Sequence, residues 1–423
     1  MRKLAILTLL PLALLGACGG GGGGGTTTPP PPPPPTQMLA TAGPPNVEPL
    51  VMDAGPAALA TAQETAVNTA FVSVKICIPN GGACQTIDHI EVDTGSSGLR
   101  VLASSDSPFT LNLPSEMSAG GLPIAECLQF ADGSAFGPVA TADITLPTSG
   151  KTLTGVNVQV IGATGWTVPS DCPGTAENTV VLFGANGILG VGPFLQDCGS
   201  ACTQTPPIAG TYYTCPTPST CAAATVTLTQ QVPNPVALFA TDNNGVIVEM
   251  PAIASGGATN PSKGVLVFGI GTETNNALGS ATVLPASDSD GFILASYNGT
   301  TNLNAALDSG SNATFFTDST IPTCTDNASF YCPTSTLNLT ATLTGTDSTM
   351  ATANFTVVNA DSVFNANSTA TAMPGLSGPI GALPGNNIMI QFDLGMPFFF
   401  GRNVFTAIEN QTTPGGTGPY YAY

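Results

Sequence analysis

Charged side chains are scarce in this 423-residue sequence, where Asp, Glu, Lys and Arg together make up 8% of the residues, against roughly 25% in an average soluble domain. Cations are the scarcest, with 7 Lys plus Arg against 26 Asp plus Glu and a formal net charge of −19. A chain this acidic repels phosphate backbones and anionic lipid head groups. The composition therefore argues against nucleic acid as a partner and against membrane attachment through charge.

Histidine is almost absent, since His89 is the only one. Serine and cysteine hydrolases need a histidine base in most designs, and His89 is interpreted as a strand residue in preference to such a base. The sequence also has no C-x-x-C pair, which is the usual ligand pattern of a zinc site. We expect neither a metal nor a cofactor.

The N-terminal residues have the pattern of a secretory signal. Arg2 and Lys3 precede an apolar run from Leu4 to Leu15, which is too short to remain as a membrane-spanning helix. The following Gly16-Ala17-Cys18 completes a segment that is similar to the bacterial lipobox, and this resemblance implies cleavage after residue 17 and acylation of Cys18. We expect a lipid-anchored protein of the bacterial cell envelope, on the outer membrane or the periplasmic face. Ordinary secretion, with Cys18 incidental, is the alternative.

Cysteine usage agrees with export from the cytoplasm. Apart from Cys18, ten of the eleven cysteines remain, and an even number in an exported protein indicates disulfides. Proximity in the sequence suggests four pairs and leaves the last two cysteines for a fifth, and the whole pairing is a hypothesis. The five proposed pairs are Cys77–Cys84, Cys198–Cys202, Cys215–Cys221, Cys324–Cys332 and, by remainder, Cys127–Cys172.

Low-complexity sequence follows Cys18. Residues 19–25 are all glycine and residues 29–35 all proline, a composition that buries too little apolar area to offset the entropy of ordering. We interpret residues 18–64 as a flexible tether.

From residue 65 onward the pattern predicts an all-β protein. Short runs of β-branched and aromatic residues alternate with turn residues. The clearest predicted strands are Phe71 to Ile78, Ala140 to Leu146, Val156 to Ile161, Val246 to Met250, Gly264 to Gly269 and Ser335 to Leu343. The length suffices for two lobes, which we place at 65–272 and 273–410. A Cys-, Pro- and Thr-rich insertion at about 165–232 belongs to the first lobe, and residues 411–423 form a tail.

Two similar acidic loops stand one in each predicted lobe. The first is Asp93-Thr94-Gly95-Ser96, at the end of a β-type run, and the second is Asp308-Ser309-Gly310-Ser311. One such loop alone is a common turn. Two of them suggest a pair of facing carboxylates, because two close carboxyl groups share one proton and can act as acid and base together.

Further segments in the same order make the chain resemble the pepsin family. These are a flap-like Phe130-Ala131-Asp132-Gly133-Ser134, then Ile188-Leu189-Gly190, Leu266-Val267-Phe268-Gly269 and Phe399-Phe400-Gly401. In that family each acidic loop is threaded beside an apolar-apolar-Gly strand. The resemblance implies a bilobal pepsin-like aspartic protease fold with its cleft between two β-barrel-like lobes, and Asp93 and Asp308 as the catalytic pair. It also implies that Ser96 and Ser311 bind the outer carboxylate oxygens, and that Thr94 and Ser309 cross-link the loops.

The sequence departs from the family at two positions. The usual flap tyrosine and its tryptophan partner are replaced by Phe130 and Arg100, and Arg100 could lie over the Phe130 ring as a cation–π pair. Two functions remain open. The first is a monomeric aspartic endopeptidase that cuts peptides or unfolded proteins. The second is an inactive pepsin-fold lipoprotein with a peptide-binding or envelope-structural role, since a fold does not guarantee its chemistry.

Overall fold

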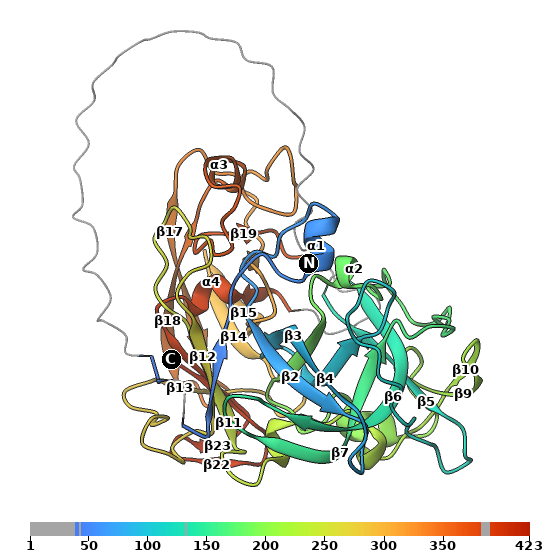
Figure 1. The fold of residues 1–423 in the computed structure, drawn as a ribbon. Helices are drawn as coiled ribbons and strands as arrows, with labels where there is room; N and C mark the ends of the chain where they lie inside the picture. The colour runs from blue at the N-terminus through green and yellow to red at the C-terminus, as the bar shows by residue number, and fades with distance from the viewer. Residues whose placement is uncertain (1–38, 42–43, 132, 382–389) are drawn as a thin grey trace, which may run out of the picture.

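The computed structural model describes residues 39–41, 44–131, 133–381 and 390–423. Over these residues the protein has two barrel-like sheets, a six-stranded sheet and a small two-stranded one (Figure 1). Helices are few and short, and the longest among the described residues has seven residues. They are α1 (Ala57–Thr61), α2 (Val180–Phe183), α3 (Ala360–Ala366) and α4 (Met396–Phe399), with 3-10 helices at Gly199–Thr203, Leu228–Gln230 and Val236–Leu238. In the described part of the chain, none of them has the length and apolar character needed to cross a bilayer.

The first barrel-like sheet has nine strands, and a further pairing of β6 with β7 closes six of them into a ring. In sheet order the strands are β10 (Thr220–Ala223), β9 (Tyr212–Thr217), β5 (Ile124–Gln129), β6 (Ser134–Thr145), β2 (Phe71–Cys77), β3 (Cys84–Asp93), β8 (Gly187–Val191), β4 (Ser97–Leu102) and β7 (Thr152–Ile161). Strand β8 is buried along its whole length because it lies between β3 and β4, which suits its continuous apolar sequence.

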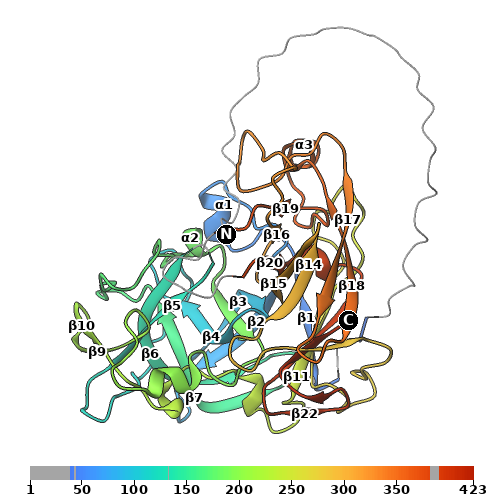
Figure 2. The ribbon, with the colours of Figure 1, turned by 180° about the vertical axis from the view of Figure 1, so that it is seen from behind.

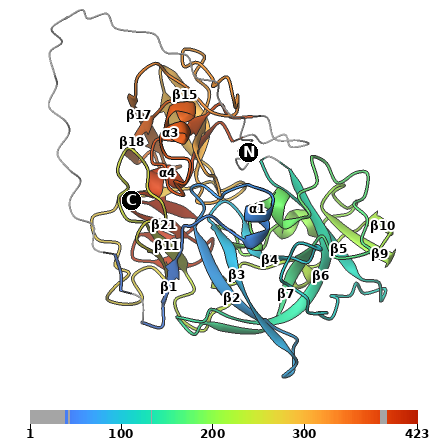
Figure 3. The ribbon, with the colours of Figure 1, turned by 45° about the horizontal axis from the view of Figure 1, so that its top comes forward.

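The second barrel-like sheet has seven strands. In sheet order they are β18 (Met350–Val357), β17 (Leu337–Thr344), β14 (Ile293–Tyr297), β15 (Thr300–Leu307), β20 (Phe392–Leu394), β16 (Thr314–Phe316) and β19 (Ser377–Gly378). Strand β17 alternates between more and less exposed residues, as expected of a strand with one face on the core. Seen from behind and from above, this sheet lies beside the first one as a separate lobe (Figures 2 and 3).

A six-stranded sheet joins the lobes and uses both ends of the described chain. Its order is β1 (Val47–Leu50), β12 (Gly264–Phe268), β11 (Gly245–Glu249), β21 (Asn403–Ala407), β24 (Tyr420–Ala422) and β13 (Val283–Pro285). A small hairpin of β22 (Thr412–Thr413) and β23 (Gly416–Thr417) precedes β24. One contiguous cluster of buried side chains extends through all three sheets, so the lobes share a core.

All six predicted strands are present, and the largest difference is in β6, which begins at Ser134 and not at Ala140. The predicted tether and the predicted tail are each wrong in part. β1 pairs with β12 from Val47 to Leu50, so the folded part begins well before residue 65. β24 pairs with β21 and β13, so residues 411–423 belong to the fold. Both segments are short and lack a long alternating pattern, which is why the sequence suggested a tether at one end and a tail at the other.

The same five cysteine pairs that were hypothesised are joined as disulfides: Cys77–Cys84, Cys127–Cys172, Cys198–Cys202, Cys215–Cys221 and Cys324–Cys332. Cys18, the proposed lipidation site, lies outside the described residues. The predicted cysteine-rich insertion at about 165–232 is wrong in part, because the range includes β8, a central strand of the first sheet. Within the same range, β9 pairs with β5 and β10 pairs with β9, and these two strands extend the sheet.

Candidate functional site

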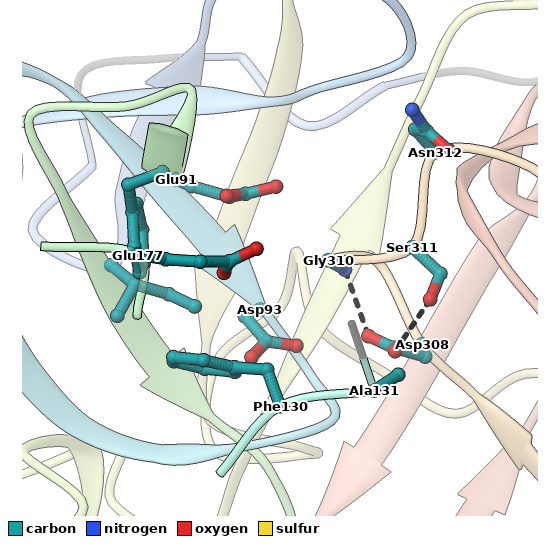
Figure 4. Close-up of a pocket in the computed structure, with 11 residues that line it drawn as sticks. Glu91, Asp93, Phe130, Ala131, Glu177, Asp308, Gly310, Ser311 and Asn312 are labelled. Carbon is teal, nitrogen blue, oxygen red and sulfur yellow. Dashed lines mark hydrogen bonds between the residues drawn. The ribbon is translucent and has the colours of Figure 1, made fainter. Parts of the chain in front are cut away.

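The two acidic loops leave the ends of matching strands, one in each lobe. Asp93 is the last residue of β3, and Asp308 follows the last residue of β15. Each of these strands has a parallel neighbour, which is β8 for β3 and β20 for β15. The parallel pairing orients both loops toward the boundary between the lobes, and Figure 4 shows the two carboxyl groups facing each other there.

The strand beside the second acidic loop is not the one that the sequence suggested. In the first lobe, Ile188-Leu189-Gly190 pairs with β3 as predicted. In the second lobe, however, Asp393-Leu394-Gly395 takes the corresponding place, because Asp393 and Leu394 pair with Ala306 and Leu307 of β15. Phe399-Phe400-Gly401 instead belongs to α4 and the turn after it.

Four hydrogen bonds cross-link the loops in a reciprocal pattern. Thr94 Oγ1 donates to the Leu307 carbonyl oxygen (2.8 Å) and accepts from the Ser309 amide (2.9 Å). Ser309 Oγ donates to the Val92 carbonyl oxygen (2.8 Å) and accepts from the Thr94 amide (3.1 Å). All four bonds are buried, so they fix the position of each acidic residue relative to the other.

Glycine is required on both loops because the carboxyl groups come so close. A Cβ atom at Gly95 would lie 2.7 Å from Asp308 Cγ, and one at Gly310 would lie 2.6 Å from Asp93 Oδ1. Both distances are shorter than a van der Waals contact. The two glycines therefore allow the approach of the opposite carboxyl group.

Each carboxyl group accepts hydrogen bonds from its own loop. The Gly95 amide donates to Asp93 Oδ1 at 2.6 Å, and Ser96 Oγ donates to Asp93 Oδ2. In the second loop the Gly310 amide donates to Asp308 Oδ1 at 2.8 Å, and Ser311 Oγ donates to Asp308 Oδ2 at 3.0 Å (Figure 4). All eight loop residues of the predicted constellation are thus brought together.

Burial raises the pKa of Asp308 well above its ordinary value, and the negative charges of Asp93 and Asp393 raise it further. A hydrogen bond with the Asp93 carboxyl group acts in the same direction, and the Gly310 amide opposes it. Two carboxyl groups can hydrogen-bond to each other only when one of them carries the proton. The two carboxyl groups are therefore arranged to share one proton.

A cavity of about 80 Å³ opens beside the two carboxyl groups. The hairpin of β5 and β6 contributes Phe130 and Ala131 to its lining, at the turn where the Phe130 amide donates to the Gly133 carbonyl oxygen. Phe130, which the sequence analysis assigned to a flap, thus lies at the cavity beside the two carboxyl groups. Gly133 and Ser134 do not line the cavity, since Ser134 is buried and its backbone bonds to Thr175 and Glu177. Asp132 lies outside the described residues.

A match to a family model covers residues 42–423 of the chain. The chain belongs to the DUF3443 family. The description of that family is "Protein of unknown function (DUF3443)". A search of curated proteins finds no match to the chain.

Five residues of the DUF3443 cavity were missed by the sequence analysis, namely Glu91, Glu177, Phe183, Ile188 as a lining residue, and Asn312. Glu91 could have been found, because it stands two residues before Asp93 on the same strand and therefore faces the same side. Glu177 and Phe183 come from the segment around α2 and carry no local signal of their position. Phe183 and Ile188 give the cavity apolar walls, and Glu91 and Glu177 add two carboxyl groups to its lining.

The predicted contact between Arg100 and Phe130 is wrong. Arg100 is fully buried and pairs with Glu126 at 2.8 Å and Asp197 at 3.0 Å. Phe130 packs edge-on against Phe183, with ring centroids 5.6 Å apart. A buried guanidinium is stabilised more by a carboxylate than by an aromatic ring. Glu126 and Asp197 provide the carboxylates for Arg100.

His89 lies away from the cavity. Its Nε2 is 3.1 Å from Asp53 Oδ1, and its Nδ1 is 3.2 Å from Asp88 Oδ1. Over the described residues, one group of three candidate metal ligands was found, made of Cys324, Cys332 and Asp361. The two cysteines are joined in a disulfide, so they offer no thiolate to a metal.

Proposed function

We propose that this DUF3443 chain is a pepsin-like aspartic endopeptidase in which Asp93 and Asp308 activate a water molecule for peptide hydrolysis. The observation that carries the proposal is the reciprocal cross-link of Thr94 and Ser309, which holds the two carboxyl groups face to face. The cross-link itself does not require an acidic residue at position 93 or 308. Two carboxyl groups buried this close together cost stability even when they share a proton, so a chemical use is the simplest reason to keep them.

The proposed reaction uses one shared proton. The ionised carboxylate takes a proton from a water molecule as that water attacks the peptide carbonyl carbon, and the protonated carboxyl group donates to the carbonyl oxygen as it gains negative charge. The raised pKa of Asp308 favours Asp308 as the acid and Asp93 as the base. The proton from the water then moves to the leaving amine, and no covalent intermediate forms.

The overall architecture supports a pepsin-like fold. Two barrel-like sheets each provide one acidic loop, and a six-stranded sheet connects them. The match of Ile188-Leu189-Gly190 to Asp393-Leu394-Gly395 in the parallel pairs gives the two lobes the same internal plan. A hairpin tip over the carboxyl groups, at Phe130 and Ala131, stands where a flap is expected.

The proposed substrates are extended peptides or unfolded proteins. The walls formed by Phe130, Phe183 and Ile188 suit apolar side chains next to the scissile bond. The five disulfides support an oxidising compartment, which agrees with the proposed place in the bacterial cell envelope and a lipid anchor at Cys18.

The second candidate is an inactive pepsin-fold lipoprotein that binds peptides or has a structural role in the envelope. One observation favours it. The cavity of about 80 Å³ is far smaller than the roughly 300–1,000 Å³ of typical ligand pockets, so the hairpin must move to admit a peptide. The base of that hairpin is fixed by the Cys127–Cys172 disulfide and by pairing of β5 with β9.

Incubation of the full-length protein with a denatured protein substrate between acidic and neutral pH tests the proposal. We expect cleavage by the parent and a loss of at least about 10³-fold in Asp93→Asn and Asp308→Asn. Asp326→Asn, an exposed acid on the second lobe, is the matched control and should cleave normally. Absence of cleavage together with binding of a statine-containing peptide would support the second candidate instead.

A further inference from the structure

A third carboxyl group lies behind the facing pair. Asp393 of β20 is 0% exposed and pairs in register with Ala306 of β15. The equivalent position in the first lobe, opposite Glu91, is Ile188. One lobe therefore has an apolar residue where the other buries an acid, and the asymmetry falls next to Asp308.

Ser311 connects this third carboxyl group to the pair. Its Oγ lies 2.6 Å from Asp393 Oδ2 and 3.0 Å from Asp308 Oδ2. A serine hydroxyl has a single hydrogen to donate, so it can donate to only one of these oxygens. The other contact is a hydrogen bond only if a carboxyl group donates to Ser311. At least one proton must therefore reside on Asp393 or Asp308 for both contacts to be made.

Asp393 is the better place for that proton. Within the described residues its Oδ1 has no hydrogen-bond partner, and an ionised carboxylate with one unsatisfied, buried oxygen is strongly unfavourable. The negative charge of Asp93 opposes ionisation of Asp393, and the hydrogen bond with Ser311 favours it. The charge of an ionised Asp393 acts in turn on Asp308 and Tyr421. Burial accordingly raises the pKa of Asp393 to about 7.

We infer that Asp393 is a positioning residue of this site, whose carboxyl group holds a second proton and donates it in a hydrogen bond to Ser311, which in turn donates to Asp308. The inference rests on the proposed function and extends it. Asp393 touches neither water nor substrate in the proposed reaction.

The consequence is a wider pH range for the facing pair. Three carboxyl groups share two protons, and a proton lost from Asp393 leaves a negative charge beside Asp308. That charge strengthens the hold of Asp308 on its own proton. The pair thus remains singly protonated after Asp393 has ionised, and the proposed peptidase stays active toward neutral pH.

The first test compares the pH dependence of kcat/KM in the full-length protein and in Asp393→Asn, whose amide can still donate to Ser311 but cannot ionise. We expect the alkaline limb to move to lower pH by on the order of one unit. Asp393→Ile, which copies the first lobe, should show the same direction, and it serves if the asparagine variant fails to fold. Asp326→Asn should leave the limb in place. An unchanged limb in a folded Asp393 variant would overturn the inference.

The second test is independent of peptidase activity. With ¹³C-labelled aspartate, the parent should show a carboxyl resonance that titrates near pH 7 and is missing from Asp393→Asn or Asp393→Ile, but present in Asp326→Asn. If the missing resonance titrates near the ordinary aspartate value of about 4, the second proton does not exist. If the parent cleaves nothing at any pH, the proposed function fails, and the resonance alone decides whether Asp393 holds its proton.

Discussion

Replacement of Thr94 by valine should destabilise the protein strongly, although the side chain keeps its shape. The change removes Oγ1, which donates to the Leu307 carbonyl and accepts from the Ser309 amide. Leu307 and Ser309 are both 0% exposed, so water cannot replace the lost partner. An unsatisfied buried group costs about 1–3 kcal/mol, and two such groups predict a loss of about 2–6 kcal/mol.

Denaturant unfolding of the full-length, disulfide-bonded protein measures this loss from the midpoint and the slope of the transition. Thr301→Val is the matched control, because Thr301 lies exposed on β15 and should change stability by no more than about 0.5 kcal/mol. A Thr94→Val variant as stable as the Thr301→Val variant would mean that the cross-link does not hold the loops together. The geometric basis of the proposed function would then be lost.

Three further predictions concern other parts of the site. Burial raises the pKa of Asp393 from 3.8 to about 7, so the free energy of unfolding of the parent should fall as pH rises from about 4 to about 7. Asp393→Asn lacks this loss, and its stability relative to the parent should therefore be about 4 kcal/mol higher at pH 8 than at pH 4. A stability difference between variant and parent that is the same at both pH values would contradict this. Gly310→Ala places a Cβ 2.6 Å from Asp93 Oδ1, so kcat/KM should fall by about 100-fold while circular dichroism shows a folded protein; unimpaired cleavage would disprove the close approach. Arg100→Leu leaves Glu126 buried without its cation, and thermal unfolding should show a loss of stability of about 3–5 kcal/mol. The double variant Arg100→Leu with Glu126→Leu should recover part of that stability, and a double variant less stable than Arg100→Leu would contradict the pairing.

Local patterns in the sequence located the parts of the site that depend on neighbours in the chain. Asp93 and Asp308 were found because each is followed at once by a hydroxyl residue and a glycine. The close disulfides, such as Cys77–Cys84, were found for the same reason, since a short loop brings its ends together.

Features that depend on distant pairing were missed. Asp393-Leu394-Gly395 breaks the apolar-apolar-Gly pattern, and the more regular Phe399-Phe400-Gly401 took its place, because only the register of β15 against β20 distinguishes them. The environment of Arg100 was misjudged because Asp197, one of its partners, stands 97 positions further along the chain. No property of Arg100 itself indicates that partner.

The first and last strands of the described chain affect the order in which the fold can be completed. β1 and β24 both belong to the sheet that joins the lobes, and β24 follows every other strand of that sheet in sequence. A polypeptide that ends before Tyr420 lacks the strand between β21 and β13. The sheet that joins the two lobes can therefore be completed only after residues 420–422 have been synthesised.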